Sequence, residues 1–108
     1  MSSHPANDAA VDAAEAIRLT SAGEAWLLDV RESHEWQAGH APRAHHIPLG
    51  ELQARQDELP AGGVILVVCH SGQRSRVATD ALRGAAYDAA NVEGGMLAWQ
   101  AAGGDVTA

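Results

Sequence analysis

The feature that most constrains the fold is an unbroken apolar run, VILVV, at residues 64–68. A strand that is apolar on both faces must be covered on both faces, as a parallel strand is when it lies between two layers of helices. The segment AWLLDV at residues 25–30 has the same character. Because stretches with helical spacing of apolar residues flank both runs, we expect an α/β fold of three layers. Its central sheet is expected to be mostly parallel, with about five strands and helices on both faces.

Strand and helix patterns alternate through most of the chain. We expect strands at residues 25–30, 45–47, 64–68 and 89–92, and helices at residues 11–21, 32–37, 50–58, 75–86 and 96–102. The pair Gly94-Gly95 is expected to form a tight turn before the last helix. A chain of 108 residues with no linker-like segment suits one core. We therefore expect a mobile N-terminal tail over residues 1–8 and a single domain over residues 9–108.

Charge and composition exclude several classes of partner. A formal net charge of −7 provides no basic field for nucleic acid or an anionic membrane. The first twenty residues carry Asp8, Asp12 and Glu15 where a signal peptide needs an apolar stretch, and no apolar run approaches membrane-spanning length. The chain has one cysteine, Cys69, so no disulfide forms within it. These features predict a cytoplasmic protein.

The cysteine lies directly after VILVV and before a short polar loop. That loop consists of His70, Ser71, Gly72, Gln73, Arg74 and Ser75. A cysteine at the end of a strand usually packs inertly, but this loop favours an anion-binding site. Gly72 lets the backbone turn its N–H groups inward, while Ser71 and Ser75 provide hydroxyl donors. Arg74 adds a fixed positive charge, and the N-terminus of the next helix stabilises a thiolate. The sequence therefore predicts Cys69 as a nucleophile.

The length of the loop indicates what the nucleophile attacks. Four residues separate Cys69 from Arg74. Cysteine-dependent phosphatases have a similar loop that is one residue longer and surrounds a tetrahedral phosphate. The shorter loop favours a smaller guest, such as the outer sulfur of a persulfide, and argues against a phosphatase.

Three blocks of sequence, in order, resemble the rhodanese-like sulfurtransferases: LLDVRESHEWQAGHAPRAHHIPL, VILVVCHSGQRS and NVEGGMLAWQAAGG. The resemblance covers about residues 24–104. It implies a rhodanese-like fold in which the Cys69 thiolate takes sulfane sulfur from thiosulfate or a related persulfide, as a cysteine persulfide. It further implies that the loop holds the outer sulfur, while Arg74 braces the loop and helps to hold an anionic donor.

The acceptor implied by this resemblance is cyanide or a thiol. Because the chain has no second cysteine, the acceptor comes from outside, either as a small thiol such as glutathione or as a thiol-bearing partner protein. Members that use thiosulfate well carry extra cations where this chain has His70 and Gln73, so we expect thiosulfate to be a poor substrate. The alternative is a sulfur carrier or persulfide-binding module that serves a partner protein and has little turnover on small donors.

Some residues depart from the family pattern or allow two interpretations. Arg43 and Ala86 stand where many family members have glycine, which concerns loop geometry rather than the reaction. Asp29 and Arg31 either orient the cysteine loop from the same sheet edge or form a turn cap and a structural ion pair. Histidines such as His40, His45 and His46 lack a cysteine or carboxylate at a regular ligand spacing, so we expect neither a metal nor a cofactor.

Overall fold

The computed structural model describes residues 9–108, and the tail expected over residues 1–8 lies outside them. Within the described residues the elements follow in this order: β1 (Ala10–Val11), α1 (Ala13–Ser21), β2 (Ala25–Asp29), α2 (Ser33–Ala38), β3 (His45–His46), the 3-10 helices η1 (Leu49–Glu51) and η2 (Gln56–Glu58), β4 (Val64–Val68), α3 (Gln73–Gly84), β5 (Asp88–Val92) and α4 (Gly95–Ala101). None of the helices in this part of the chain combines the length and the apolar character that crossing a membrane requires.

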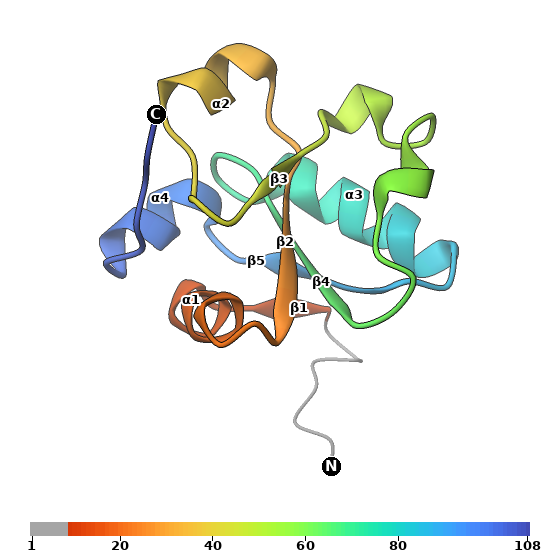
Figure 1. The fold of residues 1–108 in the computed structure, drawn as a ribbon, viewed down its shortest axis with the longest axis horizontal. Helices are drawn as coiled ribbons and strands as arrows, with labels where there is room; N and C mark the ends of the chain where they lie inside the picture. Colours follow the sequence, from red (N-terminus) through yellow and green to blue (C-terminus); the bar gives the residue numbers. More distant parts are fainter. Residues whose placement is uncertain (1–8) are drawn as a thin grey trace.

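The strands form one five-stranded sheet in the order β1-β5-β4-β2-β3, and every neighbouring pair is parallel (Figure 1). The predicted α/β fold with a parallel sheet is confirmed. In the register of β2 and β4, Asp29 pairs with Val68, and Cys69 follows directly. The two polar strand ends therefore lie at the same edge of the sheet, as the sequence predicts.

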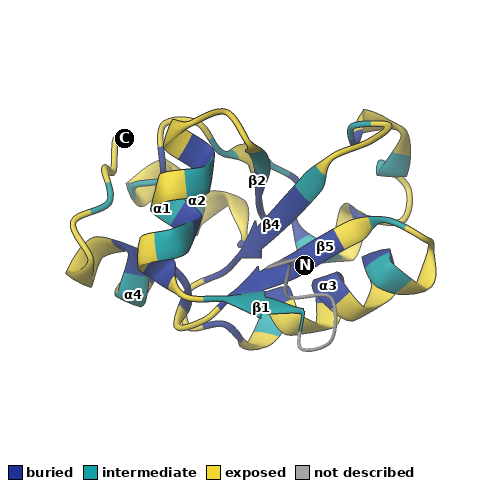
Figure 2. Ribbon diagram, turned by 90° about the horizontal axis from the view of Figure 1, so that it is seen from below, coloured by how far each residue is buried: buried dark blue, intermediate teal, exposed yellow. Residues whose placement is uncertain are grey.

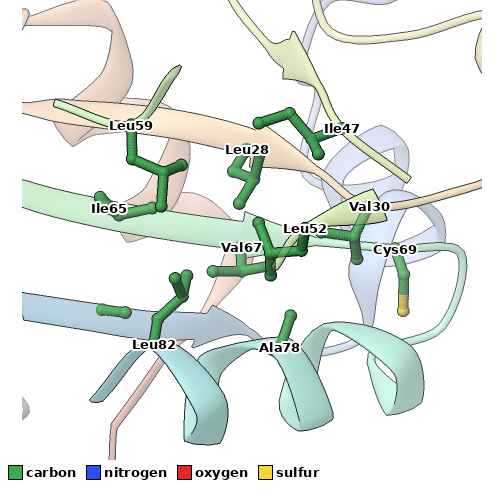
Figure 3. Packing of buried hydrophobic residues seen from close by; sticks show 11 residues of the cluster. Leu28, Val30, Ile47, Leu52, Leu59, Ile65, Val67, Cys69, Ala78 and Leu82 are labelled. Atoms are coloured by element: carbon green, nitrogen blue, oxygen red, sulfur yellow. The ribbon is translucent and has the colours of Figure 1, made fainter. Parts of the chain in front are cut away.

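The sheet is buried on both faces, and each face packs on its own layer of helices (Figure 2). The core toward α3 consists of Leu28, Val30, Ile47, Leu52, Leu59, Ile65, Val67, Cys69, Ala78, Leu82 and Ala89 (Figure 3). The core toward α1 and α4 consists of Ala16, Leu27, Ala41, Leu66, Val68, Ala90, Val92, Met96 and Trp99. Successive residues of VILVV alternate between these cores, which explains why the run holds no polar side chain. Each buried Leu, Ile or Val contributes about 1.5–3 kcal/mol, so the end of β4 is firmly positioned.

The prediction of a helix over residues 50–58 is wrong. Two separate 3-10 helices, η1 and η2, lie there instead, joined by turns. Across residues 50–59 only Leu52 and Leu59 are buried, which is too little apolar surface for the stripe that a helix needs. Arg55 holds the turns together through ion pairs with a glutamate on each side of it.

Two helix starts differ from the expectation by two residues, and the starts of α2 and α4 differ by one. α1 begins at Ala13 rather than at residue 11, because Val11 belongs to β1 and pairs with β5. Asp12 caps the helix by accepting a hydrogen bond from the Glu15 N–H at 2.8 Å. α3 begins two residues earlier than expected, because Gly72 takes a left-handed conformation, with φ of 106°, and serves as the N-cap. The cysteine loop consequently leads straight into the first turn of α3.

Candidate active site

Cys69 directly follows β4 and is buried, with 1% of its surface exposed. Its sulfur points toward the first turn of α3 (Figure 3). The backbone N–H groups of Gly72 and Ser75 donate to Cys69 Sγ at 3.1 and 3.3 Å, and Ser75 Oγ lies 3.2 Å from it. The sulfur thus occupies a cradle of donors at the N-terminus of a 12-residue helix. Such a cradle stabilises negative charge on sulfur.

The environment of Cys69 favours its ionised form. Burial of the thiol opposes ionisation. Hydrogen bonds from the side chain and backbone of Ser75, and from the backbone of two other loop residues, outweigh that effect, so the pKa of Cys69 lies below its ordinary value of 9.0. Because the thiolate is the attacking species, this arrangement prepares Cys69 for nucleophilic chemistry.

The turn between β5 and α4 holds the loop in place. Gly94 and Gly95 both take left-handed conformations, and α4 starts at Gly95, so the predicted tight turn is confirmed. The Met96 N–H donates to the Cys69 carbonyl at 2.7 Å, and the Leu97 N–H donates to the His70 carbonyl at 3.2 Å. Residues separated from the loop by a whole helix and strand therefore fix its backbone.

Arg74 braces the loop against α2. Its Nη1 and Nη2 atoms donate to the two carboxylate oxygens of Glu35 at 2.7 and 2.9 Å. This bidentate pair, with Arg74 as the main cause, holds the pKa of Glu35 at about 2, against an ordinary value of 4.5. The loop therefore remains tied to α2 well below neutral pH.

The outer side of the loop is open. His70, Ser71 and Gln73 are exposed, in contrast to the sulfur behind them. A groove of about 430 Å³ runs beside the loop, and its lining includes Gln73 and Arg76. A small molecule or the side chain of a partner therefore has access to the rim of the cradle.

The sequence model of the family described as "Rhodanese-like domain" matches residues 12–102. The chain belongs to the rhodanese-like domain family. It is 40% identical over 74 residues to YrkF of Bacillus subtilis (strain 168), whose name describes a candidate sulfur carrier; the match covers 68% of this chain and 40% of YrkF. It is 36% identical over 77 residues to YtwF of the same strain, named as a candidate sulfurtransferase, with 71% and 75% of the two chains covered.

A solved structure agrees with this assignment. The crystal structure of a rhodanese-related protein from Thermoplasma volcanium matches with a TM-score of 0.84 and 28% identity, over 91% of this chain and 96% of that one. The rhodanese-like domain described here therefore belongs to a sulfur-transfer family, although it spans less than half the length of YrkF.

Asp29 and Arg31 form a buried ion pair in this rhodanese-like domain. Arg31 Nη2 donates to Asp29 Oδ2 at 2.8 Å, and the two side chains are 7% and 0% exposed. The same guanidinium donates to the Gly39 carbonyl at 2.8 Å. Among the described residues, no hydrogen bond joins either side chain to the cysteine loop. Their direct contacts tie the end of β2 to the segment after α2.

Two polar residues at the site do not stand out in the sequence. Glu35 is the partner of Arg74, although 39 positions separate them. Asn91, on β5, is 3% exposed and contacts both Ser75 and Gly72. The sequence indicates these two residues only weakly. Asn91 is a polar residue inside an otherwise apolar strand core, and Glu35 lies in one of the blocks that resemble the rhodanese-like family.

The histidines that invite a metal hypothesis are engaged with tryptophan rings and backbone carbonyls. The His40 and His46 rings stack on Trp36 with centroid distances of 3.5 and 4.8 Å, and His45 stacks on Trp26 at 4.0 Å. Residues 9–108 contain no group of three or more His, Cys, Asp or Glu side chains arranged to hold a metal ion.

Proposed function

We propose that this rhodanese-like domain is a sulfurtransferase that carries sulfane sulfur as a persulfide on Cys69. The observation that supports the proposal most strongly is the position of the cysteine sulfur. It lies at the N-terminus of α3, within hydrogen-bond distance of the backbone N–H groups of Gly72 and Ser75 and of the Ser75 hydroxyl. The same preorganised donors suit the charge that develops on sulfur during transfer.

The reaction consists of two displacements at sulfur. The Cys69 thiolate attacks the outer sulfur of thiosulfate, the bond between that sulfur and the sulfonate group breaks, and sulfite leaves with the electron pair. A persulfide donor releases its own thiolate in the same way. An acceptor thiolate or cyanide then attacks the outer sulfur on Cys69, and the electron pair of the broken S–S bond returns to Cys69 as thiolate. Neither step consumes an oxidant or a cofactor.

The pairing of Arg74 favours a donor other than thiosulfate. Both terminal nitrogens of Arg74 donate to the Glu35 carboxylate, which neutralises the positive charge of this loop residue. Arg76 is exposed beside the groove, and its charge is screened by solvent and salt. A dianion such as thiosulfate therefore gains little attraction, and a persulfide on a small thiol or a protein is the better donor.

The same observation supports the second candidate, a sulfur carrier with little turnover on small donors. The open rim at His70 and Ser71 suits delivery to an external acceptor, and the proposed setting is the reducing cytoplasm. For the sulfurtransferase and for the carrier alike, the acceptor thiol is supplied by another molecule, because the chain has one cysteine.

The test compares donors with and without the cysteine. The wild-type protein and Cys69→Ala are incubated with cyanide and either thiosulfate or a persulfidated donor protein, and thiocyanate is measured. We expect thiocyanate from Cys69→Ala only at the background rate at which cyanide takes sulfur from each donor directly. Wild type is expected to exceed that background, and by more with the persulfidated donor. Full activity in Cys69→Ala would refute the nucleophile. Fast loading by the donor protein with slow turnover on thiosulfate favours the carrier.

A further inference from the structure

The hydroxyl group of Ser75 lies between two acceptors. Its Oγ is 3.2 Å from Cys69 Sγ and 2.5 Å from Asn91 Oδ1. A serine hydroxyl has a single proton, so it donates to one acceptor at a time. Cys69, Ser75 and Asn91 are 1%, 0% and 3% exposed, which separates all three groups from bulk water. When the proton goes to Asn91, Cys69 Sγ still accepts from the backbone N–H groups of Gly72 and Ser75. When it goes to Cys69, the buried Asn91 Oδ1 loses the Ser75 donor.

The backbone of Gly72 fixes the orientation of the Asn91 amide. Asn91 Nδ2 donates to the Gly72 carbonyl at 3.2 Å. A carbonyl oxygen only accepts, so the amide directs its NH₂ group toward Gly72 and its oxygen toward Ser75. Rotating the amide by half a turn would place Asn91 Oδ1 next to the Gly72 carbonyl oxygen, and two acceptors cannot form a hydrogen bond with each other. Asn91 Oδ1 is therefore an acceptor that depends on the Ser75 proton.

The protonation state of Cys69 decides where this proton goes. While Cys69 is a neutral thiol, its sulfur is a weak acceptor, so the Ser75 O–H donates to Asn91 Oδ1. When the S–H bond breaks and the proton leaves for solvent, the thiolate attracts the Ser75 O–H, and Asn91 Oδ1 then faces a hydroxyl oxygen without its proton. We propose that Asn91 competes with the Cys69 thiolate for the Ser75 proton and thereby limits how readily Cys69 ionises. Asn91 acts through Ser75 and is a positioning residue.

The consequence for sulfur transfer rests on the proposed function. In a Cys69 persulfide, Sγ is bonded to the outer sulfur and the negative charge is located on that outer atom. Ser75 then donates to Asn91 without competition. The network thus stabilises the loaded protein relative to the free thiolate, which makes Cys69 a poorer leaving group and retains the sulfur until an acceptor attacks.

Other groups near Cys69 are common to every variant used in the test. The charge of Arg74 acts on Cys69, and Arg74 is itself paired with Glu35. The Gly72 N–H from the start of α3 reaches the sulfur, and α4 contributes the Met96 N–H to the Cys69 carbonyl. Substituting Asn91 leaves the charge of Arg74 and the Met96 contact in place, but it removes the hydrogen bond from Asn91 Nδ2 to the Gly72 carbonyl. The same substitution in a Ser75→Ala background therefore measures any effect that reaches Cys69 through Gly72.

The experiment measures the pKa of Cys69 from the pH dependence of its alkylation by iodoacetamide, followed by intact mass. Asn91→Ala frees the Ser75 proton for the thiolate. It is expected to lower the pKa by about one unit, roughly a tenfold rise in thiolate at pH values below both pKa values. Ser75→Ala removes the donor and is expected to raise the pKa. In a Ser75→Ala background, the substitution of Asn91 is expected to have no further effect.

Thr79→Val is the matched control. Thr79 is buried, and its hydroxyl donates to the Ser75 carbonyl at 2.8 Å rather than to the side chain, so its loss should leave the pKa of Cys69 unchanged. If Asn91→Ala does not fold, Asn91→Val fills a similar volume without either hydrogen bond. An unchanged or raised pKa in the Asn91 variant, or an equal decrease without Ser75, overturns the proposal.

A second measurement needs no variant. In the wild-type protein, the NMR signals of the Asn91 side-chain amide are expected to shift with the same midpoint as the alkylation of Cys69. A signal that does not respond to this titration refutes the competition. Neither readout involves the transfer of sulfane sulfur, so a wild-type protein that fails to accept sulfane sulfur would refute the proposed function and leave this inference standing.

Discussion

Gly95→Ala is expected to disrupt the cysteine loop from outside it. Gly95 has a φ of 59°, and a Cβ atom at this position would lie 2.4 Å from the Cys69 carbonyl oxygen and 2.5 Å from that of His70. These distances are far inside van der Waals contact, and both atoms are backbone, which has little freedom to move. The loop and the start of α4 must separate for an alanine to fit.

The expected cost follows from what that separation breaks. The left-handed conformation costs alanine about 1–2 kcal/mol. The hydrogen bonds from Met96 to Cys69 and from Leu97 to His70, at 2.7 and 3.2 Å, weaken or break, at about 1 kcal/mol each or more where a buried carbonyl is left unpaired. Together these losses come to about 3–5 kcal/mol, a large part of the stability of a small domain.

Urea unfolding followed by tryptophan fluorescence measures this loss. Gly84→Ala is the matched control, because a Cβ there meets no atom within 4 Å, and alanine favours a helix. We expect the control to be neutral or stabilising by up to about 1 kcal/mol. A Gly95→Ala protein within about 0.5 kcal/mol of wild type would refute the claim that this contact positions the loop.

Three further substitutions test other parts of the structure. Arg74 lowers the pKa of Glu35 from 4.5 to about 2, so its stabilisation is present above pH 4.5 and lost as the pH falls through 2. Glu35→Gln should cost about 1–2 kcal/mol at neutral pH and nothing once the pH is well below 2, whereas a pH-independent cost in urea titrations contradicts this. Ala86→Gly should raise the free energy of unfolding by about 0.5–1 kcal/mol, because Ala86 has a φ of 72° and this left-handed conformation is strained for alanine. A lower melting temperature in the variant would contradict this strain. Arg31→Met should lower the free energy of unfolding in urea by about 3–5 kcal/mol, because it leaves the buried Asp29 carboxylate without its partner. Adding Asp29→Asn should recover much of this loss. An unchanged free energy of unfolding in Arg31→Met would contradict this reasoning.

The sheet could be predicted from sequence because its information is local. A run such as VILVV, apolar at every position, has no stable place except between two helical layers, and the structure buries its residues in two separate cores. The edge strand β1 could not be predicted, because it has two residues and forms only by pairing with β5. The segment at residues 50–58 has helix-compatible composition, and its conformation depends on how little of it the sheet buries.

The residues of the site also fall into those that the local sequence indicates and those that depend on tertiary contacts. The cysteine loop is contiguous, so its residue types and spacing can be read directly, and the helix that follows it is expected from pattern. Glu35 and Asn91 reach the loop from elements 39 and 16 positions away from their partners. Which polar side chain meets Arg74 or Ser75 depends on strand order and helix packing, and a single sequence does not encode these locally. The roles of Asp29 and Arg31 likewise depend on tertiary contacts.

Intact-mass spectrometry tests the central claim most directly. The wild-type protein and Cys69→Ser are exposed to a persulfide donor, and excess donor is then removed. If Cys69 carries sulfane sulfur, wild type gains the mass of one sulfur atom, cyanide removes it as thiocyanate, and Cys69→Ser gains nothing. A wild-type protein that gains no mass, or a serine variant that gains the same mass, contradicts a persulfide on Cys69.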